Sequence, residues 1–340
     1  MQTNSSTSFT KVSYIDIIKG FLEVGSIIAA IKIGLFELLS KESLSSKEIL
    51  LRLKLKCKLR NFEDFLDKLQ ATGNLFRKTS NSTLENQYKC ANDFFLKENP
   101  YNLIPYYMML DRFLKRLNRF DELLTEGEIK NFQDTFEILY ANPIDSRAFL
   151  NSMALMHEKQ FDIIAKKFDF KPYKTMTDIG GALGLLSVKI KIINPHIDCS
   201  TFDLPKIQND TEKFIEENGF KNHIKIVSGD MFKDSYPKSD IIVMANLTND
   251  WNDERKKILF KKAYEGLNEK GVFLIVEEFI DKKKEKNDYG LNLSLYMFLE
   301  CTDGFNISIE EVEIYAKNAG FSSIANVSSL FETSAVLCYK

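Results

Sequence analysis

Short apolar runs alternate with helical patterns through the second half of the chain. Each run has the length and the β-branched or aromatic content of a buried strand. Alternation of this kind predicts a parallel α/β sheet with helices on both faces. The predicted strands are Met176–Ile179, Asp198–Phe202, Ile224–Val227, Ile241–Ala245 and Val272–Glu277, with a C-terminal pair near Ser322–Val327 and Ser334–Tyr339.

The first half of the chain instead has apolar residues at helical spacing. This pattern runs from Tyr14 to Leu39, with Gly34 interrupting it, and Ser45 and Glu48 then have the spacing of a capping box. The order of helices followed by a hairpin predicts a winged helix, and Pro172 predicts the end of the last long helix. The remaining predicted segments are Ile49–Leu53, Asn61–Thr72, Leu75–Lys78, Gln87–Cys90, Ile104–Leu124, Ile129–Tyr140 and Arg147–Phe168.

Composition narrows the class of protein without naming a function. The 340 residues are 44% hydrophobic and 28% charged, which is typical of about two globular domains. Five cysteines are scattered without a Cys-x-x-Cys pair and only three histidines are present, so neither a disulfide framework nor a metal site is indicated. The polar N-terminus lacks a hydrophobic signal core, and we therefore expect a cytoplasmic protein that does not enter a membrane.

Nucleic acid is not an expected partner. The net charge is -2, so no general cationic field would attract phosphate. The basic run Arg52–Arg60 is followed by a helix with Glu63, Asp64 and Asp67, which would repel phosphate. We interpret the run as a solvated face.

A glycine cluster follows the first predicted strand of the α/β region. Gly180 and Gly184 allow the backbone to pass close to a ligand, and the first amides of the next helix are free to donate. Asp203 ends the second strand, where a carboxylate can bind ribose hydroxyls. These features indicate a nucleoside cofactor. A Gly-x-Gly-x-x-Gly nicotinamide motif is excluded, because Ala182 and Leu185 occupy its later glycine positions.

Five sequence blocks resemble, in order, those of the caffeate/hydroxyindole-type O-methyltransferases. The resemblance implies a Rossmann-like class I methyltransferase domain at residues 171–340, preceded by an all-helical, winged-helix-like dimerisation domain at residues 1–170. It also implies S-adenosylmethionine (SAM) as cofactor, a small-molecule methyl acceptor and a homodimer. The blocks are Asp178-x-Gly180-Gly181-x-x-Gly184, Asn194-Pro195, Phe202-Asp203-Leu204-Pro205, Gly229-Asp230-Met231-Phe232 and Asn249-Asp250-Trp251-x-Asp253-Glu254.

The same resemblance implies a set of cofactor-binding residues. The glycine loop would approach SAM through its backbone, Asp203 would bind the ribose, and Asp230 with Met231 would contact the adenine. The full set is Asp178, Gly180, Gly181, Gly184, Asp203, Leu204, Asp230 and Met231.

The catalytic positions depart from the family pattern. In the resembled family a histidine before Asp-Trp is the base that deprotonates the acceptor, and two later acids orient it. Here Asn249 precedes Asp250 at that position, the first acid matches Glu277, and the second falls on Asn306. Asparagine cannot accept a proton at physiological pH, although it can hydrogen-bond an acceptor.

Three hypotheses can explain this departure. The acceptor can be one that needs no deprotonation, such as an amine or a thioether, and a thioether would place the chain near the branch that resembles the S-methyltransferases of dimethylsulfoniopropionate synthesis. Alternatively His157 is the base for a hydroxyl, or the protein binds SAM without catalysis. A lone histidine among apolar residues is more often structural, as are methionines at helical spacing. The candidate acceptor-binding residues are Met153, Met156, Trp251, Met297 and Asn306.

Overall fold

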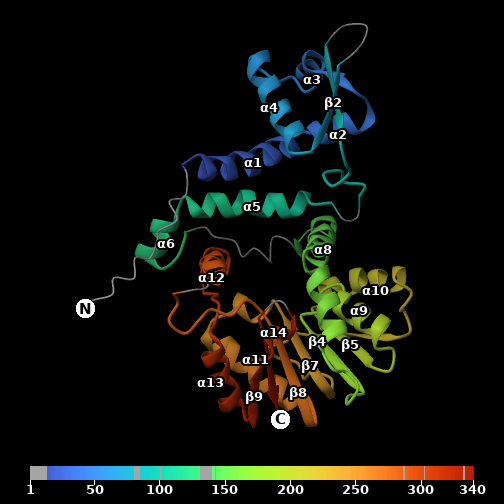
Figure 1. Ribbon diagram of the computed structural model, residues 1–340, viewed down its shortest axis with the longest axis vertical. Coiled ribbons are helices and arrows are strands. Elements are labelled where there is room, and N and C mark those ends of the chain that lie inside the picture. The colour runs from blue at the N-terminus through green and yellow to red at the C-terminus, as the bar shows by residue number, and fades with distance from the viewer. Residues whose placement is uncertain are drawn as a thin grey trace, which may run out of the picture. The chain divides into compact units, whose positions relative to one another are not determined.

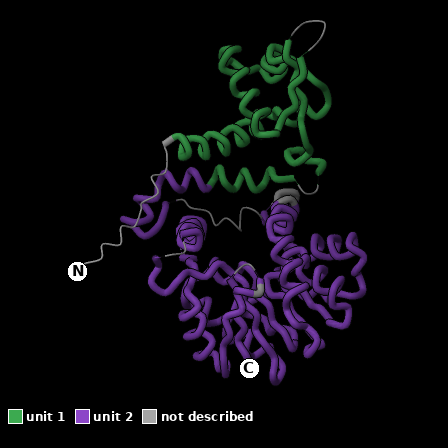
Figure 2. Tube along the Cα trace, in the orientation of Figure 1, with its two compact units in different colours: residues 1–112 green, residues 113–340 purple. Residues whose placement is uncertain are grey.

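The chain forms two compact units, residues 1–112 and residues 113–340 (Figure 2). The computed structural model describes residues 14–79, 85–99, 102–130, 140–141, 143–285, 288–301, 303–331 and 334–340. The division differs from the predicted boundary near residue 170. The reason is that helix α8 (Pro143–Lys167) packs on α9 (Leu185–Ile193) and on α14 (Ser328–Phe331), so it belongs to the second unit.

The first unit contains the predicted helices and hairpin. Gly34, with φ of 74°, separates the first two helices, and Ser45 and Glu48 form the predicted capping box. The hairpin pairs with a further short strand in the order β1-β3-β2, so the unit holds a small antiparallel sheet in addition to its helices. Its elements are α1 (Tyr14–Lys32), α2 (Leu35–Lys41), β1 (Leu44–Ser45), α3 (Ser46–Arg52), α4 (Leu59–Ala71), β2 (Leu75–Thr79), β3 (Asn86–Cys90) and most of α5 (Ile104–Leu117).

The second unit is built on a seven-stranded sheet of order β6-β5-β4-β7-β8-β10-β9 (Figure 1). The five strands from β6 to β8 run parallel as predicted, whereas β10 is antiparallel to both of its neighbours. The strands are β4 (Thr175–Ile179), β5 (Asp198–Asp203), β6 (Ile224–Ser228), β7 (Ser239–Ala245), β8 (Leu267–Val276), β9 (Ser323–Asn326) and β10 (Ala335–Tyr339). Besides α8, α9 and α14, its helical elements are α6 (Phe120–Glu126), η1 (Pro205–Ile207), α10 (Gln208–Glu217), η2 (Thr248–Asp250), α11 (Asp253–Gly266), α12 (Asp288–Cys301) and α13 (Ile309–Ala319).

Both faces of this sheet are covered by helices. Ile241 and Val243 of β7 belong to the apolar core under α8, α9 and α10, while Ile242 and Met244 belong to the core under α11 and α13. Burial on both faces explains why the strands read as continuous apolar runs. Of the helices in the described ranges, none is long and apolar enough to cross a membrane.

The strand order reverses at β4. The chain proceeds from β4 outward to β5 and β6, and then returns to the other side of β4 as β7. Ligands of open α/β sheets bind where the strand order reverses in this way. The residues that follow β4, β5, β6 and β7 therefore lie at the edge where a ligand is expected.

Candidate functional site

The glycine loop between β4 and α9 packs closely against neighbouring side chains. A Cβ atom added to Gly181 would lie against Thr201 Oγ1 and within 2.8 Å of Asp178 Oδ2, so no side chain fits there. Gly184, with φ of 78°, precedes α9, and Gly180 N–H donates to the Phe202 carbonyl at 2.9 Å. This arrangement fits a ligand held by backbone atoms at a helix N-terminus.

Asp203 stabilises this loop from the end of β5. Its Oδ2 accepts the Ala182 amide at 2.8 Å, and its Oδ1 accepts the Leu204 amide at 2.7 Å. Burial raises its pKa, and these two hydrogen bonds oppose the rise. Each carboxylate oxygen keeps a further lone pair, so Asp203 can still accept hydrogen bonds from a ribose diol. The exposed Leu204 lies directly beside it.

Asp178 lies beneath the same loop as a buried acid at the end of β4. Burial, together with the nearby Asp203 carboxylate, raises the pKa of Asp178 from its usual 3.8 to about 8. At neutral pH the side chain is therefore mostly protonated and can donate a hydrogen bond as well as accept one.

Asp230 and Met231 follow β6. The Asp230 carboxylate is paired with Lys233 Nζ at 2.9 Å, and it accepts the Phe232 amide at 2.9 Å. The hydrogen bond from Lys233 is the main reason that its pKa is lowered, and burial opposes this. Met231 is half-buried against the α11 side of the core. The loop thus offers a fixed carboxylate and an apolar thioether next to the end of β5.

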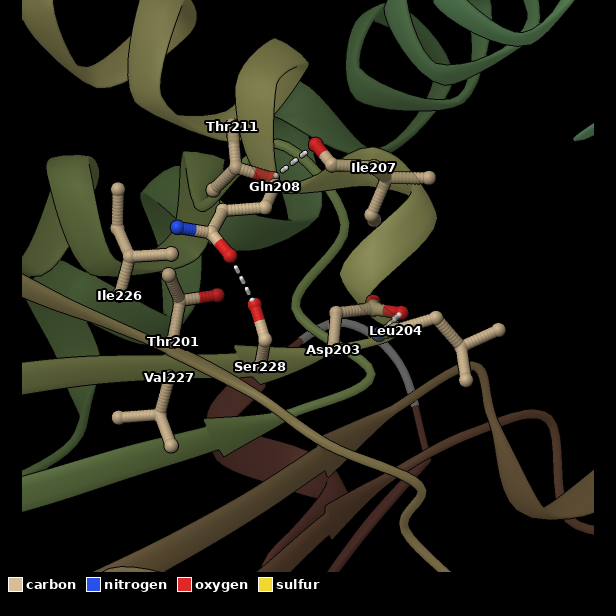
Figure 3. A pocket seen from close by; sticks show the side chains of 9 residues that line it. All are labelled: Thr201, Asp203, Leu204, Ile207, Gln208, Thr211, Ile226, Val227 and Ser228. Carbon is tan, nitrogen blue, oxygen red and sulfur yellow. Dashed lines mark hydrogen bonds between the residues drawn. The ribbon is translucent and has the colours of Figure 1, made fainter.

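A shallow crevice lies between α10 and the ends of β5 and β6 (Figure 3). A hydrogen bond of 2.6 Å from Ser228 Oγ to Gln208 Oε1 crosses it. Of the predicted cofactor residues it includes Asp203 and Leu204. Its lining residues are Thr201, Asp203, Leu204, Ile207, Gln208, Thr211, Ile226, Val227 and Ser228.

His157, on α8, contacts Asn246, which directly follows β7 and carries no sequence motif. Asn246, with φ of 52°, places its amide nitrogen 3.2 Å from His157 Nδ1, and the same nitrogen donates to Gln160 Oε1 at 2.7 Å. Because an amide nitrogen only donates, His157 Nδ1 is the acceptor and the ring is neutral. Burial lowers the pKa of His157, which favours the same neutral form.

The turn that carries Asn249 is held by Glu277. The buried Glu277 carboxylate accepts the amides of Leu247, at 3.0 Å, and of Thr248, and it accepts the Thr248 hydroxyl at 2.7 Å. Burial raises its pKa, and these hydrogen bonds oppose the rise. The position expected to orient a base therefore orients the backbone of η2. Asn249 itself is 6% exposed, and its Oδ1 has no hydrogen-bond partner among the described residues.

Asn306 lies in a loop that packs on this turn. A Cβ atom on Gly304 would lie 2.8 Å from the Asn249 carbonyl oxygen, so the two backbones are in direct contact. Asn306 Nδ2 donates to the Glu278 carbonyl at 2.7 Å, which identifies the other amide atom as oxygen. That Oδ1 is also buried and has no partner within the described ranges. Asn249, Glu277 and Asn306 are thus brought together.

Aromatic residues connect the turn to the cofactor loops. Trp251 packs edge-on against Phe232 at 4.8 Å between ring centroids, beside the predicted adenine residues. Tyr140, which the sequence analysis did not select, is close enough to Asp203 and Asp250 that both carboxylates, after burial, raise its pKa. Asp250 and the predicted ribose-binding residue Asp203 thus both lie near Tyr140. No local sequence signal marks Tyr140.

The three candidate methionines lie on two helices. Met153 precedes His157 by one turn of α8 and is half-buried, while Met156 is about half exposed. Met297 is half-buried on α12, which packs on η2. The structure therefore places Met153 beside the histidine and Met297 on the helix that borders the Asn249 turn.

The sequence of the second unit matches one known family. A profile of the O-methyltransferase domain family matches residues 114–322. The chain belongs to this family. Family membership confirms the predicted SAM-dependent methyltransferase activity and the predicted fold of the second unit.

Three relatives illustrate the range of the family. The tetracenomycin polyketide synthesis 8-O-methyl transferase TcmO of Streptomyces glaucescens is 25% identical over 301 residues, 88% of each chain. The N,N-dimethyltransferase OxyT of Streptomyces rimosus is 25% identical over 182 residues, 54% of this chain and 53% of OxyT. The structure of PigF with SAH, a methyl transferase of Serratia sp. (strain ATCC 39006), has a TM-score of 0.82 at 22% identity and covers 97% of this chain and 100% of PigF.

Proposed function

We propose that this methyltransferase acts on a heteroatom that needs no deprotonation by the protein, as in an amine or a thioether. The observation that carries the proposal is Asn249, a buried amide at the position where the family pattern has a base. Glu277 cannot replace that base, because its oxygens already hold the η2 backbone. The second supporting acid is replaced by Asn306, which is also unable to accept a proton.

The two buried amides favour an amine over a thioether. Asn249 Oδ1 and Asn306 Oδ1 are acceptors without a partner in the described part of the chain, and buried acceptors of this kind require a donor. An amine provides N–H donors, whereas a thioether such as a methylthio hydroxy acid provides none at its sulfur. OxyT is an N,N-dimethyltransferase, so N-methylation occurs among the relatives of this chain.

Bound SAM supplies an electrophilic methyl group on a sulfonium. In the proposed reaction the neutral amine nitrogen forms a bond to the methyl carbon as the carbon–sulfur bond breaks, and the bonding pair stays on sulfur. The nitrogen becomes an ammonium and later releases a proton to solvent. Asn249 and Asn306 contribute by orienting the amine, and positioning alone can supply much of such a displacement.

A second candidate function is methylation of a hydroxyl with His157 as base. It is favoured by the location of His157 at the end of β7 and by the burial that keeps its ring neutral. Against it, Nδ1 already accepts a hydrogen bond from Asn246, and the remaining Nε2 of this tautomer carries the proton. Proton abstraction would require that tautomer to change.

A screen of methyl acceptors tests the proposal. Amines, thioethers, phenols and carboxylates would be incubated with SAM and the protein, and the release of S-adenosylhomocysteine would be measured. We expect primary or secondary amines to be the best class. Turnover restricted to phenols or other hydroxyls would overturn the proposal and favour His157 as base.

We also propose that the protein assembles as a homodimer through its first unit. Support comes from α1, which exposes large apolar side chains on one stretch: Ile15 is 73% exposed, Phe21 55% and Leu22 58%. Ile15, Ile18 and Leu22 also line a groove with Lys19 and Lys68. A contiguous apolar surface of this kind is typical of a protein interface. The cytoplasmic location and the absence of a nucleic-acid partner stay predictions from the sequence.

A further inference from the structure

The charged side chain of Lys256 is buried inside the second unit, next to the turn that carries Asn249. Its side chain is 0% exposed on α11, although lysine is almost never fully buried without partners. Nζ donates to the main-chain carbonyl of Trp251 and lies 3.5 Å from the centroid of the Phe305 ring. Trp251 directly follows the η2 turn, and Phe305 directly precedes Asn306. The ammonium therefore contacts both segments that carry the buried amides.

The surroundings of Lys256 are strongly charged. The carboxylates that face it come from η2, from α11 itself, from the end of β8 and from α13, and each favours the ammonium. Burial outweighs them and lowers the pKa of Lys256 from 10.5 to about 8. Asp253 is also bonded by the Tyr315 hydroxyl at 2.6 Å and by Lys257. The facing carboxylates are Asp250, Asp253, Glu277 and Glu311.

We propose that Lys256 is a positioning residue for methyl transfer, whose ammonium holds the Trp251 carbonyl and the Phe305 ring together and so sets the spacing between Asn249 and Asn306. The proposal rests on the function proposed above for these two amides. It explains why a cation is buried at this point. Burying a charge costs stability, and an apolar side chain of similar volume would fill the same space more favourably.

The sign of the pH dependence follows from the lowered pKa. Below pH 8 the folded protein contains a buried ammonium, which costs stability relative to the unfolded chain. This cost is relieved as the pH rises from about 8 toward 10.5, because the folded state then loses the proton that the unfolded state keeps. The positioning contact has the opposite dependence. It is complete at pH 7 and weakens as the ammonium becomes neutral above pH 8.

The test compares Lys256→Met and Lys256→Arg with the full-length protein, using the best acceptor of the screen. Lys261→Met is the matched control, since Lys261 is an exposed lysine on the same helix. At pH 7 we expect Lys256→Met to unfold at a higher temperature than the wild type and to bind SAM within about twofold of it. We expect its kcat to fall about 10- to 100-fold, because small displacements of reacting groups have effects of this order.

The dependence of kcat on pH separates positioning from a structural role. We expect the wild-type kcat at saturating acceptor to fall as the pH passes about 8. Lys256→Met should lack this fall, and Lys256→Arg should move it to higher pH, because arginine stays charged. A wild-type kcat in Lys256→Met, or the same alkaline fall in Lys256→Arg, would overturn the proposal. Failure of the wild type to methylate any amine would instead contradict the proposed function.

Discussion

At the residue scale, Asp178 shows how a carboxyl group in this fold changes its chemistry by burial. Its pKa is raised to about 8 in the folded protein, while the unfolded chain has an ordinary value near 3.8. The folded state therefore keeps a proton that the unfolded state loses between these two values. The stability that this residue contributes is fully present below about pH 4 and is lost as the pH rises through about 8.

This difference predicts the behaviour of Asp178→Asn, which replaces the neutral acid with a neutral amide of the same shape. We expect the variant without cofactor to lose less stability than the wild type between pH 5 and pH 8.5. The difference should be on the order of a few kcal/mol, since each pKa unit corresponds to about 1.4 kcal/mol. Denaturant unfolding at the two pH values measures it. Asp198→Asn, at an exposed position on β5, is the control. If the wild type and Asp178→Asn lose the same unfolding free energy between the two pH values, the raised pKa of Asp178 is refuted.

At the scale of elements, the turn η2 carries the departure from the family pattern, and its chemistry can be tested by restoring a histidine. For an amine acceptor we expect Asn249→His to give no gain in rate, because the amine loses its proton to solvent before it reacts and needs no base from the protein. Asn249→Ala should lose about tenfold, which corresponds to one hydrogen bond to the acceptor. The measurement is kcat/KM against pH for the wild type, Asn249→His and His157→Ala.

The same pH profiles distinguish the acceptor from a protein base. A rising limb that belongs to the acceptor should move when an amine of different pKa is used, and it should persist in His157→Ala. A limb that disappears with His157, together with a loss of about 10²-fold or more, would identify His157 as a general base. That result would return the protein to proton-abstracting methyl transfer.

The elements also show what local sequence can predict. The strands, the glycine turn and the capping box of Ser45 depend on neighbouring residues, so their positions were predicted to within a few residues. The antiparallel direction of β10 was not, because a buried apolar run has no signal for direction. The two compact units divide after residue 112 and not near residue 170, because α8 packs on α9, which lies later in the sequence.

For the site residues too, contacts between segments that are distant in the sequence could not be predicted. Glu277 lies next to the Asn249 turn, where its carboxylate accepts backbone amides and the Thr248 hydroxyl and does not orient a base. Asn246, Tyr140 and Lys256 were missed, because their neighbours come from other elements. For Asn246 a signal did exist, since the residue directly after a strand beside β4 lies at the ligand edge of the sheet.

At the scale of the whole molecule, the first unit leaves an apolar surface on α1 that a second copy of the chain can cover. Phe21 and Leu22 contribute adjacent exposed side chains to it, and full burial of a large apolar side chain is worth about 1.5–3 kcal/mol. In a symmetric dimer each substituted side chain is counted twice, once in each subunit. Changes on this face should therefore act strongly on assembly.

We predict that the wild type sediments as a dimer at micromolar concentration and that the double variant Phe21→Glu, Leu22→Lys sediments as a monomer. The dissociation constant should rise at least 100-fold, since two apolar contacts per subunit are lost and charges replace them. Leu51→Lys is the matched control, because Leu51 is a 79% exposed apolar residue on α3, away from α1 in the sequence. Sedimentation velocity over a concentration series measures all three proteins. A monomeric wild type, or a double variant that remains dimeric, would show that this face of α1 is not the subunit interface.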